Sequence, residues 1–122
     1  MINYGKEDKA FSTGAIRSSL DADGNLKGRM DLIPWEAVRL LSIHMEKALN
    51  HYPAHNCDLG IPQHSLLDSA MRHGAKYIAG WTDEDHLVSM AWNVMLALQQ
   101  TITKPELIDI PWRKDNGSDE QG

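Results

Sequence analysis

The sequence predicts an all-α fold, a three-helix bundle-like core with an irregular N-terminal segment, which we expect to be oligomeric. Apolar residues recur at helical spacing along most of residues 34–102. Prolines and glycines divide this region into three stretches, each long enough for a helix of several turns. The last stretch is apolar on nearly every side, which is typical of a central helix covered by its neighbours or by another subunit.

The 122 residues suit a single domain, which we expect to occupy residues 1–112. Residues 1–33 are rich in glycine and charge, and this texture predicts an irregular cover with short extended pieces. Asp21 to Gly24 is predicted to form a turn, because aspartate caps turns and glycine accepts a positive φ. A calcium loop is excluded there, since Gly24 stands fourth rather than sixth in the segment. Residues 113–122 are predicted to be a disordered tail.

The first helix is predicted over residues 35–51, because Pro34 suits a helix start and Pro53 ends the pattern. Its apolar face is formed by Val38, Leu41, Met45, Ala48 and Leu49. Near the C-terminus, the apolar residues that we expect to dock on the helical body are Ile108, Ile110 and Trp112.

The second helix is predicted over residues 63–79, with Gly80 as its C-terminal cap. Its apolar stripe consists of Leu66, Leu67, Ala70, Met71, Ala75 and Ile78. The third helix is predicted over residues 82–102, where Thr82 and Asp85 have the spacing of a capping box.

Composition and charge exclude several classes of protein. A formal net charge of -5, with the six histidines neutral, argues against broad nucleic-acid binding but leaves room for a local phosphate pocket. The N-terminus lacks the apolar core of a signal peptide, and no apolar run approaches the roughly 20 residues of a membrane span. The single cysteine, Cys57, cannot form an intramolecular disulfide, so we expect a reducing, cytoplasmic location.

Asn93 is the sharpest anomaly within the apolar run of residues 87–98. A buried side-chain amide costs on the order of 1–3 kcal/mol unless it has a hydrogen-bond partner. Asp85 and Ser89 lie at helical spacing from Asn93 and would form a polar stripe along one side of the helix. Two interpretations stay open: a structural network that fixes helix packing, and a functional site.

His73 lies among apolar residues at helical spacing, so it is either a satisfied core histidine or part of a site. Asp68 and Arg72 are four residues apart and can pair along the same helix. Over the three helices, a combination of polar residues resembles the clusters with which helix bundles hold Mg²⁺ or Mn²⁺: Glu46, Asp68, His73, Asp85 and Asn93.

Two N-terminal segments place glycine beside cations: Gly14 near Arg17, and Gly28 between Lys27 and Arg29. Glycine lets backbone N–H groups approach a ligand, and the arginine fork matches phosphate geometry. Neither segment is a Walker loop or a dinucleotide fingerprint. We interpret them either as phosphate contacts or as surface loops.

Six segments occur in a characteristic order between roughly residues 11 and 98: FSTGAIR, KGRMDLIPWEAV, HMEKALNHY, NCDLGIP, DSAMRHGAKYIAG and DEDHLVSMAWNVMLAL. This order resembles a family of small phage and bacterial proteins labelled dATP/dGTP diphosphohydrolase, which is distantly similar to the all-α MazG-type pyrophosphohydrolases. The chain departs from the MazG pattern, because it has neither the ExxE nor the ExxD metal motif. It also has Cys57 where the family leads us to expect an aromatic residue.

The resemblance implies conversion of a purine (deoxy)nucleoside triphosphate to its monophosphate and pyrophosphate with a divalent metal. In this interpretation Glu46, Asp68 and Asp85 hold Mg²⁺ or Mn²⁺, and Glu46 and His73 are catalytic, with His73 as general base. The residues expected to bind the nucleotide are Arg17, Lys27, Arg29, Arg72 and Asn93. The alternatives are a non-catalytic phage protein that sequesters nucleotides and a structural oligomer. Each implies a homo-oligomer in the host cytoplasm, without nucleic acid or membrane.

Overall fold

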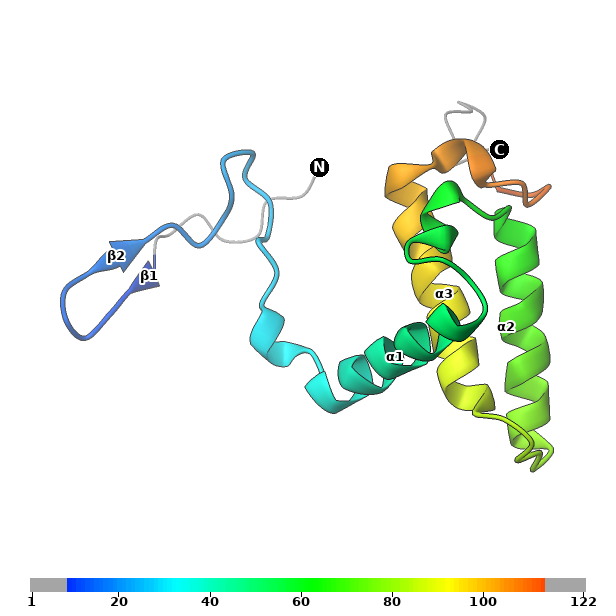
Figure 1. Ribbon diagram of the computed structural model, residues 1–122. Coiled ribbons are helices and arrows are strands. Elements are labelled where there is room, and N and C mark those ends of the chain that lie inside the picture. Colours follow the sequence, from blue (N-terminus) through cyan, green and yellow to red (C-terminus); the bar gives the residue numbers. More distant parts are fainter. Residues whose placement is uncertain (1–8, 114–122) are drawn as a thin grey trace. The chain divides into compact units, whose positions relative to one another are not determined.

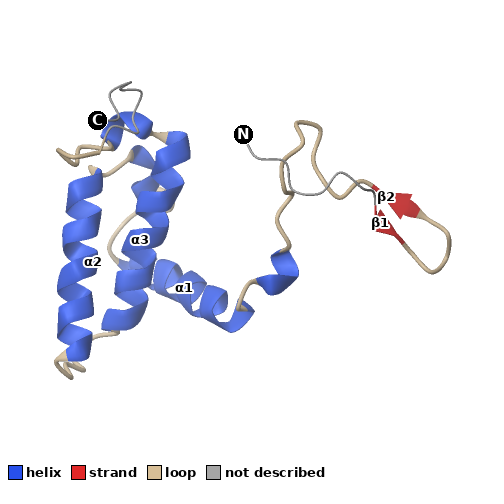
Figure 2. Cartoon of the chain, turned by 180° about the vertical axis from the view of Figure 1, so that it is seen from behind, coloured by secondary structure: helices blue, strands red, loops and turns tan. Residues whose placement is uncertain are grey.

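The computed structural model describes residues 9–113, which divide into two compact units with a boundary between Pro34 and Trp35. Figure 1 follows the chain through both units, and Figure 2 shows the short strands of the first unit and the long helices of the second. The described residues are mostly helical, as the sequence predicts. The predicted tail falls outside the described residues from position 114 onward.

The first unit contains the short extended pieces that its sequence predicts. Strands β1 (Lys9–Ala10) and β2 (Ile16–Arg17) pair in antiparallel fashion. The predicted turn that follows them is confirmed, because the Asp21 carboxylate accepts hydrogen bonds from the backbone N–H groups of Asp23 and Asn25, both at 2.9 Å. These two side-chain hydrogen bonds cap the turn.

Within the described residues, three α-helices form the second unit. Helix α1 spans Trp35–Lys47, α2 spans Gln63–Ile78 and α3 spans His86–Thr103. Short 3-10 turns lie at Met30–Leu32, Ala48–Asn50, Asn56–Leu59 and Pro105–Leu107. Helices α2 and α3 run antiparallel side by side, and α1 lies against α3 (Figures 1 and 2). None of the helices in the described part of the chain combines the length and hydropathy that a membrane crossing requires.

Gly80 marks the end of α2 and Asp85 the start of α3, on either side of the loop that joins the two helices. Gly80 has a φ of 87°, and the backbone N–H of the next residue donates to the Lys76 carbonyl oxygen at 3.0 Å, which confirms the predicted cap. The predicted start of α3 at Thr82 is wrong. The Asp85 carboxylate caps the helix instead, because it accepts a hydrogen bond from the Val88 backbone N–H at 3.4 Å.

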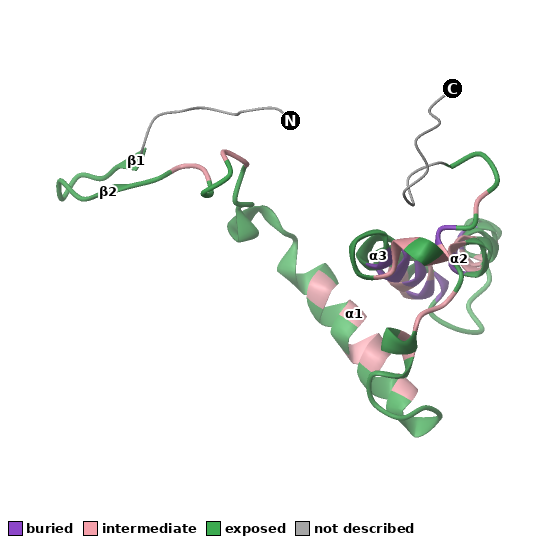
Figure 3. Ribbon diagram, turned by 90° about the horizontal axis from the view of Figure 1, so that it is seen from above, coloured by how far each residue is buried: buried purple, intermediate pink, exposed green. Residues whose placement is uncertain are grey.

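The buried face of α2 follows Leu66, Ala70 and Gly74, each four residues after the last. Gly74 leaves room for α3, since a Cβ there would come within 3.0 Å of a methionine sulfur on α3. Figure 3 shows buried residues where α2 and α3 face each other. The prediction that Met71 and Ile78 share this face is wrong, because they are 74% and 87% exposed. Ala70 and Gly74 add little or no side-chain bulk, so α3 packs against their side of α2 and leaves Met71 and Ile78 outside the contact.

The apolar core is small and joins the hairpin to the segment before α2. Its buried members are Leu66, Leu96 and Ala97, and the half-buried residues packed on them are Cys57, Ile61, Leu67 and Trp92. Gln100, on α3, accepts a hydrogen bond from the Ile61 backbone N–H at 2.9 Å and donates one to the Ile61 carbonyl oxygen at 2.7 Å. Both packing and hydrogen bonds therefore hold this segment against α3.

Helix α3 has polar side chains inside and many apolar side chains outside. The buried polar residues are His86, Ser89, Asn93 and Gln100. The exposed large apolar residues are Leu87, Val94, Met95, Leu98 and Ile102. Within residues 35–113, neighbouring elements leave this apolar side exposed. Cover by another subunit, the other form of the prediction, stays a prediction. The buried polar residues have hydrogen-bond partners inside the fold: His86 meets His73 of α2, Asn93 donates to the Ser89 carbonyl oxygen, and Gln100 bonds Ile61.

After α3 the chain passes beside the start of α2, where Asp109 contacts His64. Ile108 is buried, as predicted, whereas the predicted docking of Trp112 is wrong: it is 87% exposed, because the chain turns at Pro111. The Asp109 carboxylate accepts hydrogen bonds from the His64 backbone N–H at 2.9 Å and from the ring Nδ1 at 2.5 Å. These bonds hold the pKa of Asp109 below its ordinary value.

Replacing Asp109 by Asn is expected to remove an acid-sensitive part of the stability. A carboxylate whose pKa is lowered by folding stabilises the fold above its unfolded pKa of about 3.9. This contribution is lost as the pH falls through the lower pKa of the folded state. In urea titrations below about pH 4, the free energy of unfolding of the wild type should therefore drop more steeply than that of Asp109→Asn. The exposed change Glu106→Gln is the control, and equal slopes for all three proteins would contradict the expectation.

Candidate metal centre

His86, the first residue of α3, is the largest fully buried side chain among the described residues, at 1% exposure. The turn before the helix holds it in place. Its ring Nε2 lies 2.7 Å from Oδ1 of Asp83, and its backbone N–H donates to the Glu84 carbonyl oxygen at 3.0 Å. One ring nitrogen is thus committed to a carboxylate, and the other, Nδ1, faces α2.

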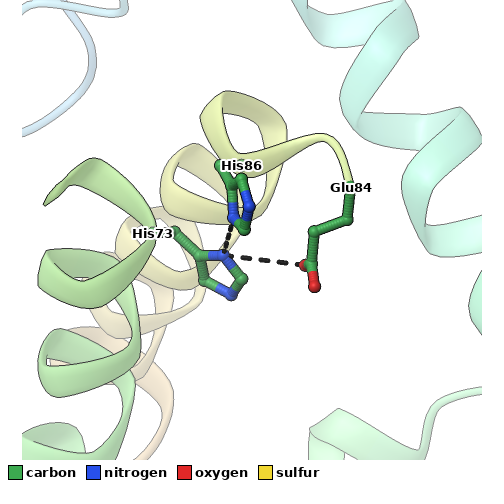
Figure 4. A group of neighbouring side chains, drawn as sticks. All are labelled: His73, Glu84 and His86. Atoms are coloured by element: carbon green, nitrogen blue, oxygen red, sulfur yellow. Dashed lines mark hydrogen bonds and ion pairs between the residues drawn. The ribbon is translucent and has the colours of Figure 1, made fainter. Parts of the chain in front are cut away.

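His73, Glu84 and His86 form a cluster that we call the dihistidine group (Figure 4). His73, on α2, has its Nδ1 at 2.9 Å from Nδ1 of His86. The Glu84 Oε1 lies 3.7 Å from the same His73 nitrogen. One potential ligand atom from each residue lies within 4.8 Å of the other two, and no other trio of His, Cys, Asp or Glu between positions 9 and 113 meets this condition.

The hydrogen bonds define where the protons of the dihistidine group lie. An ionised Asp83 can only accept, so Nε2 of a neutral His86 carries the proton and its Nδ1 keeps a lone pair. Nδ1–H of His73 then donates to that lone pair. If the proton of His73 moved from Nδ1 to Nε2, a metal ion in its place would receive two imidazole nitrogens and one carboxylate oxygen.

This donor set fits a divalent transition metal. Imidazole nitrogens favour zinc-like ions and carboxylates also suit Mn²⁺, whereas Mg²⁺ prefers an all-oxygen set. Three protein ligands leave coordination positions open for water or substrate, as in catalytic sites. The bond from His86 to Asp83 is the outer contact that metal-binding histidines usually make, because it fixes the tautomer of the ring.

The protonation states of the neighbouring residues suit such a site. Burial lowers the pKa of His73, and the Glu84 carboxylate opposes this effect without cancelling it. The hydrogen bond from His86 lowers the pKa of Asp83. At neutral pH His73 is therefore neutral, as metal coordination requires, and Asp83 is ionised and accepts the hydrogen bond from the His86 ring.

The carboxylates predicted from the sequence lie elsewhere. Asp68 pairs with Arg72 along α2, as their spacing predicts. Asp85 caps α3, and Glu46 is exposed on α1. The structure therefore brings His73 to Glu84 and His86 and does not add Glu46, Asp68 or Asp85 to that group, so the joint metal role of those three stays a prediction.

The predicted nucleotide-binding residues also have local partners. Asn93 is buried, and its side-chain amide donates to the Ser89 backbone carbonyl oxygen at 2.8 Å. This bond agrees with the interpretation of Asn93 as a structural residue. Lys27 donates to a backbone carbonyl oxygen at 2.8 Å, and Arg29 pairs with Asp31 at 2.7 Å. Arg17 is exposed on β2. These three cations lie in the first unit.

Sequence reasoning did not select Asp83, Glu84 or His86 as site residues. The signal was the run of three acids directly before a histidine. Helix capping and the helix dipole are enough to explain such a run from the sequence alone. Only the packing of α2 against α3 places His73 beside both Glu84 and His86.

A protein-family model described as "dATP/dGTP diphosphohydrolase, N-terminal" matches residues 17–110. The matched region is most of the chain and contains the whole dihistidine group. Searches of curated proteins and of solved structures gave no match.

Proposed function

Because the chain belongs to the "dATP/dGTP diphosphohydrolase, N-terminal" family, we propose that it hydrolyses purine (deoxy)nucleoside triphosphates to monophosphate and pyrophosphate with a divalent metal. The observation that carries the proposal is the dihistidine group, whose three side chains would hold the metal. When bound, such an ion supplies Lewis-acid polarisation of phosphate and orientation of water. Asp83 would keep His86 in the tautomer that this binding needs.

Cations beside the dihistidine group would neutralise the triphosphate. Lys76 holds its ammonium 5.2 Å from the centre of the Trp81 ring, which lies 6.4 Å from the ring of His86. Arg72 precedes His73 on α2, and an exposed ion pair such as the one it forms is weak enough to exchange for phosphate. The other residues proposed to bind the nucleotide are Arg17, Lys27, Arg29 and Asn93.

The sequence-based assignments form an alternative version of this proposal. In that version Glu46, Asp68 and Asp85 hold the metal, and His73 acts as general base together with Glu46. Both versions give the same reaction, but they place the metal on different side chains. Variants of His86 and Glu46 distinguish them.

The test is an incubation of metal-free protein with dATP, dGTP, ATP or GTP, followed by ion-pair chromatography. We expect monophosphate and pyrophosphate in proportion to protein, and faster turnover with Mn²⁺ than with Mg²⁺ because of the two imidazole ligands. EDTA should abolish the reaction. A nucleotide that is bound but left intact would support the non-catalytic binder instead, and no binding at all would favour a structural oligomer.

We further propose that the exposed apolar side of α3 joins two copies of the chain. Leu87, Val94, Leu98 and Ile102 follow one another at helical spacing, and α3 contains no Asp, Glu, Lys or Arg. A two-fold axis lets such a stripe cover itself. Leu98→Glu should therefore sediment as a monomer under conditions where the wild type is a dimer, and Leu59→Glu, at an exposed leucine outside the stripe, should stay dimeric. A wild type that is monomeric at every concentration would refute this.

A further inference from the structure

A pocket of about 390 Å³ lies between α1, the segment before α2, and α3. Its walls include His44, Ala48, Tyr52, Asn56, Ile61 and Trp92, and no member of the dihistidine group lines it. The volume lies within the range of small-molecule sites, roughly 300–1,000 Å³. It is therefore a second feature of the fold that a ligand can occupy.

The walls of this pocket are mainly apolar and include several aromatic rings. No Asp, Glu, Lys or Arg lines it. The rings of His44 and Trp92 have their centres 6.0 Å apart at an angle of 51°, and Tyr52 adds a third ring. Aliphatic side chains complete the lining. Such walls favour a flat, uncharged, aromatic ligand over a phosphate or a metal ion.

Asn56 gives the pocket a polar edge. Its backbone N–H donates to the Pro53 carbonyl oxygen at 3.2 Å. Its side-chain amide forms no hydrogen bond with any residue that the structure describes. An amide presents a donor beside an acceptor, and this pair can match the donor and acceptor atoms on the edge of a purine.

We propose that this pocket binds the purine base of the nucleotide, with Trp92 as a stacking surface and Asn56 as the contact to the base edge. The inference rests on the proposed function for the identity of its ligand. Trp92 and His86 are six residues apart on α3, about 9 Å along the helix axis. Six residues also turn the helix by about 600°, so the two side chains leave it in directions about 120° apart. One rigid helix thus carries a wall of the base pocket and a member of the dihistidine group.

Cys57 provides a built-in reporter of pocket occupancy. It is the sole cysteine of the sequence, it lines the pocket, and it is half-buried. Burial and the neighbouring Asp58 raise the pKa of its thiol, so alkylation by iodoacetamide is slow enough to time. Deoxyadenosine or deoxyguanosine, added to the full chain without metal, should slow this alkylation about tenfold at ten times its Kd. Deoxyribose alone should not slow it.

Three variants make the test specific. Trp92→Leu should lose the nucleoside protection of Cys57 and raise the KM for triphosphate hydrolysis. Trp112→Leu changes an exposed indole outside the pocket and should retain both properties. Ala48→Phe adds bulk inside the pocket without removing any ring, so it should lose the protection even where Trp92→Leu fails to fold.

The outcomes separate this inference from the proposed reaction. Hydrolysis without nucleoside protection, and with an unchanged KM in Trp92→Leu and Ala48→Phe, would overturn the base pocket and leave the reaction intact. Protection by nucleosides without any hydrolysis would support the base pocket and count against the reaction. Intact-mass spectrometry measures the alkylation rate in each case.

Discussion

His86→Gln is expected to abolish tight Mn²⁺ binding and to lower metal-dependent hydrolysis by about 100-fold or more. The imidazole Nδ1 of His86 lies 2.9 Å from that of His73, and both would coordinate the same ion. Glutamine is close in size and can still bond Asp83, so it removes a ligand without opening a large cavity in a buried site. Titration calorimetry with Mn²⁺ alone measures the binding, and chromatography of dATP products measures turnover.

Matched carboxylate variants decide where the metal lies. Glu46→Gln and Asp85→Asn should retain Mn²⁺ binding, and asparagine at position 85 can still cap α3. Asp83→Asn should weaken Mn²⁺ binding by about 10- to 100-fold, because it frees the His86 ring while leaving all three ligands in place. If Glu46→Gln and Asp85→Asn lose the metal while His86→Gln keeps it, the carboxylate site predicted from the sequence is correct and the dihistidine site is wrong.

The local parts of this fold could be predicted because short-range rules determine them. Gly80 caps α2, Asp21 closes a turn, and Asp68 pairs with Arg72 one helical turn away, all as the spacing indicates. Each depends on residues within a few positions of one another. The helices themselves follow from apolar periodicity for the same reason.

The site could not be predicted in the same way, because it depends on how α2 and α3 pack. His73 and His86 are 13 residues apart and belong to different helices, and only the hairpin brings their Nδ1 atoms to 2.9 Å. Periodicity located an apolar α3 but did not tell which side meets α2. Ala70 and Gly74 determine which side of α3 meets α2, because their lack of side-chain bulk allows the close approach that buries His86.

Gln100→Leu is expected to be the most destabilising single change outside the dihistidine group. The Gln100 side chain is 3% exposed and bonds both the N–H and the carbonyl oxygen of Ile61. Leucine fills a similar volume but leaves two backbone groups without partners, at a cost of about 1–3 kcal/mol for each. Urea unfolding should show a loss within the sum of these costs. Gln99→Leu, at the exposed neighbouring position, should change the stability far less.

The same change links stability to ligand binding, because Ile61 packs on the core and also lines the proposed base pocket. Without Gln100, the segment that carries Cys57 and Ile61 loses its paired hydrogen bonds to α3. Alkylation of Cys57 should then be faster in Gln100→Leu than in the wild type, even under conditions where both proteins are folded. Equal alkylation rates, together with a reduced stability, would mean that Gln100 stabilises the whole unit and does not hold the pocket wall.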